Sequence, residues 1–207
     1  VSSVSKDVDE SESSLIFVGI TGMIDPERDG VSGAITECHN AGIEVMMITG
    51  DHEVTEKAIA KNIGLLDDDS IVMSSEEFDR LSDKKLMSII EKIRVVARAY
   101  PLQKLRIIQA LQKKGHIVAM TGDGVNDAPA LKKADIGLSM GISGTEVAKE
   151  SSKAVLVDDH FTTIVGAIRE GRNIYDKIIK SAKYLLSCNF GEIMTVMLAL
   201  FFDFPIP

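Results

Sequence analysis

Cysteines and clustered histidines are scarce in this sequence of 207 residues. The two cysteines, Cys38 and Cys188, are far apart and in unrelated surroundings, which excludes a disulfide framework and favours a reducing compartment. The histidines do not have the spacing of metal ligands, which argues against a zinc site. They are His39, His52, His116 and His160.

An excess of basic residues is also lacking. The formal net charge is −8 and the sequence pI is close to 5.0. Proteins that bind nucleic acids usually carry a basic face that displaces counterions from the phosphate backbone. We therefore expect no nucleic acid among the partners, and the acidity by itself identifies no other partner.

The first 14 residues lack the positively charged start and the apolar stretch of a signal peptide. They are rich in serine and acidic residues and have almost no apolar periodicity. This composition is typical of a linker that buries too little apolar surface to fold by itself. We interpret residues 1–14 as a linker.

Apolar content is ample, at 45% of the residues, which is enough for one domain with a substantial core. Strand-like runs alternate with helix-like patterns, and this alternation predicts an α/β fold with a mostly parallel sheet and helices on both faces. We expect strands over residues 15–20, 43–48, 71–73, 95–99, 116–120, 134–139 and 154–157. We expect helices over 30–41, 54–63, 76–93 with a break near Ser82, 102–113, 126–133, and from 161 onward.

The carboxyl-terminal run from 185 to 204 is mostly apolar and long enough to span a bilayer as a helix. A basic excess precedes it, as expected on the cytoplasmic side of a membrane. This excess consists of Arg169, Arg172, Lys177, Lys180 and Lys183, against Glu170 and Asp176. We predict one membrane helix with its amino end inside; the alternative is a buried helix of a soluble protein.

Two carboxylates four residues apart, Asp123 and Asp127, lie in a Gly-rich turn directly after the apolar run 116–120. Open α/β sheets place their ligands at the carboxyl ends of strands. Carboxylate oxygens there suit Mg²⁺, which takes one or two carboxylates together with waters and phosphate oxygens. Without a cation to share, the two acids would repel each other. The pattern predicts a site for phosphate and magnesium.

Thr49 and Lys104 are two further candidates for the same edge of the sheet. Thr49 follows the strand-like run 43–48, where its hydroxyl and the following amides are suited to a phosphoryl oxygen; a helix cap is the alternative. Lys104 lies one turn into a helix that begins after Pro101. The helix dipole disfavours a cation at this end of a helix unless an anion lies nearby. For Lys104 the alternative is a solvated surface group.

At these residues the sequence resembles the P-type cation-transporting ATPases of the haloacid dehalogenase superfamily. The matching motifs are Met47-Ile48-Thr49-Gly50-Asp51, Pro101-Leu102-Gln103-Lys104, the run from Thr121 to Leu131, and Gly22-Met23-Ile24-Asp25-Pro26-Glu27-Arg28. The run from Thr121 is highly specific, and the resemblance covers nearly the whole chain from Leu15.

The resemblance implies a haloacid-dehalogenase-like, Rossmann-type sheet and a role for each motif residue. Thr49, with Gly50 and Asp51, would bind the phosphoryl group of ATP, and Lys104 would neutralise it and hold the catalytic aspartate. Asp123 would coordinate the Mg²⁺ cofactor. Asn126 and Asp127 would complete the phosphate and metal shell.

The resemblance continues into the apolar helix, where Tyr184 to Glu192 is similar to the fifth membrane helix of the calcium-pump branch. It makes Asn189 and Glu192 candidate ligands of a transported cation, with Ca²⁺ favoured. Three residues apart on a helix, the two side chains share one face, and an amide oxygen beside a carboxylate suits a hard cation. Alternatively, Glu192 is protonated or pairs with another helix.

The sequence also departs from the family, because the nucleophile motif Asp-Lys-Thr-Gly does not occur in it. Without that carboxylate the chain alone cannot form an aspartyl phosphate. The nucleotide-binding domain and the earlier membrane helices are missing too, so we expect partner domains from the amino-terminal part of a pump. The resemblance divides the chain into a linker (1–14), the carboxyl-terminal part of a phosphorylation domain in the cytoplasm (15–160), a helical stalk (161–183) and the start of a transport domain in membrane lipid (184–207).

Two other hypotheses stay open. The first is a Mg²⁺-dependent phosphohydrolase of the same superfamily with Asp25 as nucleophile, although Pro26 stiffens that loop and Glu27 fits the usual second acid only loosely. The second is a non-enzymatic remnant that binds Mg²⁺ and phosphate without turnover.

Overall fold

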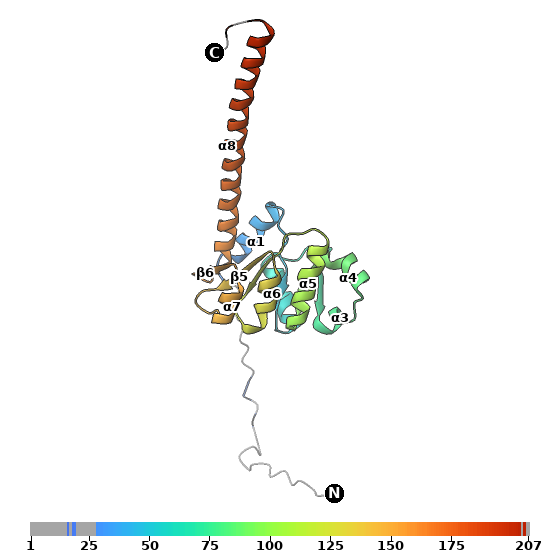
Figure 1. The fold of residues 1–207 in the computed structure, drawn as a ribbon. Helices are drawn as coiled ribbons and strands as arrows, with labels where there is room; N and C mark the ends of the chain where they lie inside the picture. Colours follow the sequence, from blue (N-terminus) through green and yellow to red (C-terminus); the bar gives the residue numbers. More distant parts are fainter. Residues whose placement is uncertain (1–15, 17, 20–27, 204, 206–207) are drawn as a thin grey trace.

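Parallel strands with helices packed against them form the domain in this computed structural model (Figure 1). The structure describes residues 16, 18–19, 28–203 and 205. Its elements up to the middle of the domain are α1 (Val31–Asn40), β1 (Met47–Ile48), α2 (Glu53–Asn62), β2 (Ile71–Ser74), α3 (Ser75–Asp79), α4 (Asp83–Ile89), the 3-10 turn η2 (Ile90–Lys92) and β3 (Ile93–Ala97). There follow α5 (Pro101–Lys113), β4 (Ala119–Gly122), the 3-10 turn η3 (Val125–Asp127), α6 (Ala128–Lys133), β5 (Ile136–Met140), α7 (Glu146–Ser151), β6 (Ala154–Leu156) and α8 (Phe161–Phe201).

The strands form two three-stranded sheets, ordered β1-β3-β2 and β4-β5-β6. Every pairing in them is parallel, which confirms the predicted α/β class. Every residue of β3 is buried, as expected for a central strand covered on both faces. Among the described residues β1 and β4 are each paired on one side only, and the loops of the predicted site follow these two strands.

Several element bounds differ from the sequence predictions. The strand expected over 43–48 is confined to Met47–Ile48, and the one expected over 116–120 is shifted to Ala119–Gly122; these are the residues in register with β3 and β5 in the described part of the chain. The predicted break near Ser82 in the helical segment 76–93 is confirmed, since the Ser82 hydroxyl caps α4, but Ile93 already belongs to β3. Helix α7 was not anticipated. The strand over 15–20 and the candidate Asp25 fall largely or wholly outside the described residues.

Helix α5 contacts the cores on the two sides of the domain through successive residues. Ile107 packs in one cluster with Phe78, Ile90 and Val96 beside the first sheet. Ile108 packs in another cluster with Leu131 beside the second sheet. Because Lys104 lies one turn before these two isoleucines on the same helix, the packing of α5 fixes where the lysine reaches.

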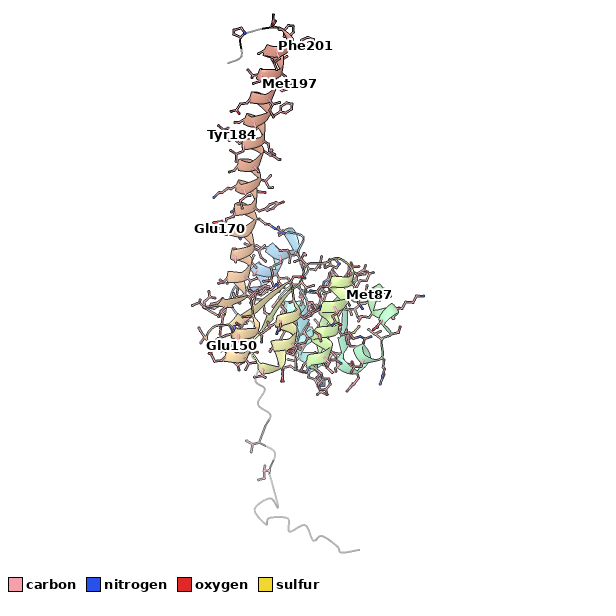
Figure 2. All side chains as sticks on the ribbon, in the orientation of Figure 1. Met87, Glu150, Glu170, Tyr184, Met197 and Phe201 are labelled. Atoms are coloured by element: carbon pink, nitrogen blue, oxygen red, sulfur yellow. The ribbon has the colours of Figure 1, made fainter. Side chains whose placement is uncertain are left out.

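Helix α8 is 41 residues long, about 60 Å at 1.5 Å per residue, and most of it stands clear of the domain (Figure 1). Its first turns are anchored, because Val165 packs with Ala34 and Cys38 of α1. Further along, Figure 2 shows Tyr184, Met197 and Phe201 on the projecting part, with 69%, 58% and 82% of their surfaces exposed. By length and composition α8 qualifies as a membrane span, and its most apolar stretch is hardly buried. The helix ends at Phe201 rather than at 204.

Candidate phosphate and magnesium site

An ion pair between Lys104 and Asp127 is the centre of the predicted site. The Lys104 Nζ donates to Asp127 Oδ1 over 2.6 Å, and the two side chains are only 17% and 8% exposed. Burial of this kind excludes a solvated surface role for Lys104. The cation that offsets the negative charge of Asp127 in this turn is therefore Lys104 of the chain itself.

The start of α5 places this lysine. Pro101 opens the helix at a position where its missing N–H costs no hydrogen bond. The Gln103 Oε1 accepts a hydrogen bond from the Tyr100 amide over 2.9 Å, and its Nε2 donates to the Ser75 carbonyl oxygen over 3.0 Å. Gln103 is 3% exposed, so these bonds hold the helix start rigidly against α3.

The turn after β4 closes on the second oxygen of Asp127. The Asp127 Oδ2 accepts from the amides of Asp123 and Gly124 over 3.3 and 3.2 Å. Gly122 has no room for a side chain, because a Cβ there would lie 2.5 Å from the Asp127 Cβ. The Gly-rich run is thus required for the carboxylate of Asp127 to fold back under its own loop.

Asp123 and Asn126 lie on the exposed side of the same turn. Within the part of the chain that the structure describes, neither side chain has a hydrogen bond or an ion pair. Asp123 consequently has both carboxylate oxygens available, whereas those of Asp127 are engaged.

Thr49 and Asp51 follow β1 and are bonded to the segment that leads into α5. The Thr49 carbonyl oxygen accepts from the Ala99 amide over 2.8 Å, and the Asp51 carbonyl oxygen accepts from the Arg98 amide over 3.2 Å. The cap of α2 is His52, whose Nδ1 accepts from the Val54 amide, so Thr49 is not the helix cap. Among the described residues no hydrogen bond joins the loop of Thr49 and Gly50 to the loop of Asp123.

Glu56, which was not among the predicted site residues, faces Thr49 from the first turn of α2. The Thr49 Oγ1 donates to Glu56 Oε1 over 3.2 Å, and Glu56 is 5% exposed. Burial raises the pKa of the Glu56 carboxyl; the Thr49 bond lowers it and the neighbouring Asp51 raises it further. In the sequence, the one sign of this contact was an acidic residue seven positions after Thr49, in the first turn of the following helix.

The loop from Gly141 to Thr145 after β5 was missed as well. Asp159 holds it, because its carboxylate accepts hydrogen bonds from the amides of Gly141, Ile142 and Ser143 and from the Ser143 hydroxyl. Burial alone would raise the pKa of Asp159, but these bonds outweigh it and lower the pKa to about 2. The consecutive acids Asp158 and Asp159 before α8 were the signal.

The donor set fits Mg²⁺ when phosphate completes it. Among the described residues no three His, Cys, Asp or Glu side chains lie close enough to hold a metal ion. Mg²⁺ needs no such cage, since it is held by one or two carboxylates together with waters and substrate phosphate oxygens. The free carboxylate of Asp123 meets that requirement, and Asp127 orients the turn beneath it.

The two candidate cation ligands lie far along α8. Asn189 and Glu192 are exposed, and neither side chain has a polar partner among the residues that the structure describes. Being three residues apart, they share one face of the helix. They lie on the part of α8 that follows its anchored first turns, and no described contact joins them to the candidate phosphate and magnesium site.

Comparison with known proteins identifies the domain. Residues 5–135 match the family of haloacid dehalogenase-like hydrolases. The chain is 53% identical over 201 residues to calcium-transporting ATPase 1 of Bacillus cereus, covering 97% of this chain and 23% of that protein. It is 48% identical over 210 residues to the P-type sodium-transporting ATPase4 of Toxoplasma gondii, covering 96% and 16%.

A solved structure agrees with these sequence matches. A zinc-transporting PIB-type ATPase superposes with a TM-score of 0.64 and 28% identity over 84% of this chain and 24% of that one. The chain thus spans about a quarter or less of the relatives that it matches. It belongs to the haloacid dehalogenase-like hydrolases, with P-type cation-transporting ATPases as its relatives.

Proposed function

We propose that the chain is a section of an ATP-driven P-type cation pump that holds Mg²⁺ and the phosphoryl group and begins the transport domain. The observation that carries the proposal is the buried Lys104–Asp127 pair beneath the free carboxylate of Asp123. A phosphoryl-transfer site needs such preorganised positive charge next to a metal ligand.

Each residue of the site has a part in this proposal. The Thr49 hydroxyl and the Gly50 amide bind phosphoryl oxygens, and Asp51, whose amide donates to Thr49 Oγ1 over 3.1 Å, holds that hydroxyl in place. Lys104, held by Asp127, offsets the charge of the equatorial oxygens, and Asn126 lies beside them on the exposed side of the turn. Asp123 would hold Mg²⁺, which when bound supplies charge neutralisation to the phosphoryl oxygens.

The nucleophile in this proposal comes from outside the chain, since no Asp-Lys-Thr-Gly occurs in it. An aspartate oxygen attacks the γ-phosphorus of ATP, the bond to the β-phosphate oxygen breaks, and ADP leaves. Water then hydrolyses the acyl phosphate. Among the described residues β1 and β4 each have one unpaired edge, and this supports the proposal that a further parallel strand carries the aspartate.

The cation sites in the proposal include Asn189 and Glu192 on the membrane-spanning part of α8. The continuity of α8 from its contact with α1 to Phe201 supports coupling between phosphoryl transfer and ion binding. An amide oxygen beside a carboxylate suits a hard cation, and we propose Ca²⁺ as the transported ion. The phosphorylation domain then lies in the cytoplasm.

The test replaces the matching segment of the Bacillus cereus calcium-transporting ATPase with this chain. Inside-out membrane vesicles carrying the chimera are expected to form an acid-stable phosphoenzyme from radiolabelled ATP and to accumulate Ca²⁺. Lys104→Ala is expected to abolish both activities, whereas Glu192→Gln is expected to abolish Ca²⁺ uptake and leave phosphorylation by inorganic phosphate intact. A correctly inserted chimera without phosphoenzyme would contradict the proposal, and uptake of Na⁺ in place of Ca²⁺ would correct the ion.

A further inference from the structure

The hydroxyl of Thr49 is already committed to hydrogen bonds within the chain. It accepts from the Asp51 amide over 3.1 Å and donates its single hydrogen to Glu56 Oε1 over 3.2 Å. A phosphoryl oxygen or a sulfate oxygen only accepts hydrogen bonds. Thr49 can therefore bind such an anion only when its hydrogen turns away from Glu56.

The protonation state of Glu56 decides whether the hydrogen can turn. An ionised carboxylate accepts and cannot donate, so it retains the Thr49 hydrogen and places a negative charge beside the anion. A protonated carboxyl carries a hydrogen of its own, which it can donate to the Thr49 oxygen. The Thr49 hydrogen is then released toward the anion, and the like-charge repulsion disappears.

Among the described residues no cation forms an ion pair with Glu56. Helix α2 packs against β2 and β3, and near the pair of Thr49 and Glu56 it also meets the end of β1. Neither β1 nor β2 contains a titratable residue, and the guanidinium of Arg94 on β3 is bound to Glu44 and to the Glu91 carbonyl oxygen.

The other charged groups around Glu56 come from its own helix and from the loops before α2 and after β3. On α2 these are Glu53, Lys57 and Lys61, and on the loops they are Asp51, His52 and Arg98. Of these, the Asp51 carboxylate is the one that acts on Glu56, and it disfavours the ionised form. Burial of Glu56, at 5% exposure, acts in the same direction.

We propose that Glu56 is a positioning residue that gates the Thr49 hydroxyl, so that binding of a tetrahedral dianion at Thr49 is coupled to uptake of a proton by Glu56. The inference rests on the proposed function in taking Thr49 as the phosphoryl-binding residue. The proton comes from solvent when the anion arrives and returns to solvent when the anion leaves. A phosphate-binding site built in this way binds its anion more tightly as the pH falls.

The test measures anion binding to the purified chain in detergent, with Mg²⁺ present. Sulfate is the probe, because it stays a dianion across the pH range from about 5 to 8 and its own titration does not confound the result. Binding is followed by the amide NMR shifts of Gly50 and Asp51. In a second measurement, calorimetry in two buffers of different ionisation enthalpy counts the protons taken up, which requires no variant.

The wild-type chain is expected to bind sulfate more tightly as the pH falls and to take up protons on binding. Glu56→Gln mimics the protonated carboxyl, so it is expected to bind sulfate about tenfold more tightly at pH 7.5, the size of one hydrogen bond to a charged group, with affinity independent of pH. Glu53→Gln is the matched control: it removes the same charge from the same helix without touching Thr49, and is expected to retain the wild-type pH profile.

Equal affinity and equal pH dependence in the wild type and Glu56→Gln, without proton uptake, would overturn the inference. If Thr49→Ala abolishes sulfate binding in that case, the phosphoryl role of Thr49 stands and only the gate is wrong. If no variant binds sulfate or inorganic phosphate, or Thr49→Ala binds as the wild type does, the inference fails together with the phosphoryl role of Thr49.

Discussion

The amide of Thr145 donates a hydrogen bond of 2.8 Å to the carbonyl oxygen of Asp123. This bond ties the loop after β5 to the residue that we propose as the Mg²⁺ ligand. The same loop is bonded along its amides to Asp159, directly before α8. A continuous set of hydrogen bonds thus runs from the turn after β4 to the start of the long helix.

Asp159 is expected to make the stability of the domain depend on pH at the acidic end. Its pKa in the folded chain is lowered from 3.8 to about 2, so the stabilisation is complete above the unfolded value and is lost as the pH falls from about 4 to 2. Asp159→Asn should lower the melting temperature measured by circular dichroism at pH 7, and the difference from the wild type should shrink toward pH 2. Asp176→Asn on α8 is the control and should melt like the wild type at both values. A difference that stays constant with pH would contradict the role of the Asp159 charge.

Glu56 is expected to act on stability in the opposite direction. Its pKa in the folded chain lies above the ordinary value of 4.5, so folding favours the protonated form. The cost of ionisation is therefore present above the folded pKa and absent below the unfolded one. Glu56→Gln should therefore raise the melting temperature at pH 7.5 and have little effect at pH 4. Glu53→Gln should change the melting temperature little at either pH. A Glu56→Gln variant that melts below the wild type at pH 7.5 would show that the carboxylate is stabilising.

Loss of Lys104 is expected to destabilise the domain as well as the site. Lys104→Ala leaves the buried carboxylate of Asp127 without its ion pair, which should cost about 3 kcal/mol in the free energy of unfolding. Lys149→Ala removes the exposed pair with Glu146 and should cost at most about 1 kcal/mol. Urea denaturation of the two variants measures the contrast, and equal losses would refute the buried, paired state of Lys104.

Gly144 is expected to tolerate no side chain. A Cβ there would lie 2.0 Å from the Met140 carbonyl oxygen, so Gly144→Ala must distort the loop that supports Asp123. Gly33→Ala is the counterpart, because nothing lies within 4 Å of its Cβ position and alanine has a higher helix propensity than glycine in the first turn of α1. Gly33→Ala should stabilise the chain by about 0.5 to 1 kcal/mol, whereas Gly144→Ala should destabilise it. Thermal melts of both variants give the signs.

The apolar part of α8 is expected to bring the chain into membranes. Removal of residues 184–207 should shift the expressed chain from the membrane fraction to the soluble fraction, since the most apolar stretch of α8 is hardly buried against the domain. Carbonate extraction measures this, with Leu198→Ala as a control that should stay in the membrane. A full chain that carbonate releases would contradict a membrane span.

Much of the local structure followed from the sequence by itself. Alternation of apolar runs with helical patterns is set by neighbouring residues, and it predicted the parallel α/β class and the long helix from 161. Capping is equally local, so the break at Ser82 and the start of α5 at Pro101 were predictable. Residue types at the ends of strands marked Thr49, Asp123 and Asp127, and a lysine in the first turn of a helix marked Lys104, as candidates for one kind of chemistry.

The tertiary structure alone decided which of these groups meet. Lys104 and Asp127 are 23 positions apart, and their contact depends on how α5 packs beside both sheets. Asp159 contacts the loop after β5, and Glu56 contacts Thr49. Both contacts depend on how the ends of strands and the starts of helices pack together, which the pattern of neighbouring residues in the sequence does not determine. Burial then shifts the pKa of Glu56, and aligned amides shift that of Asp159, and both effects come from the packed environment rather than from residue type.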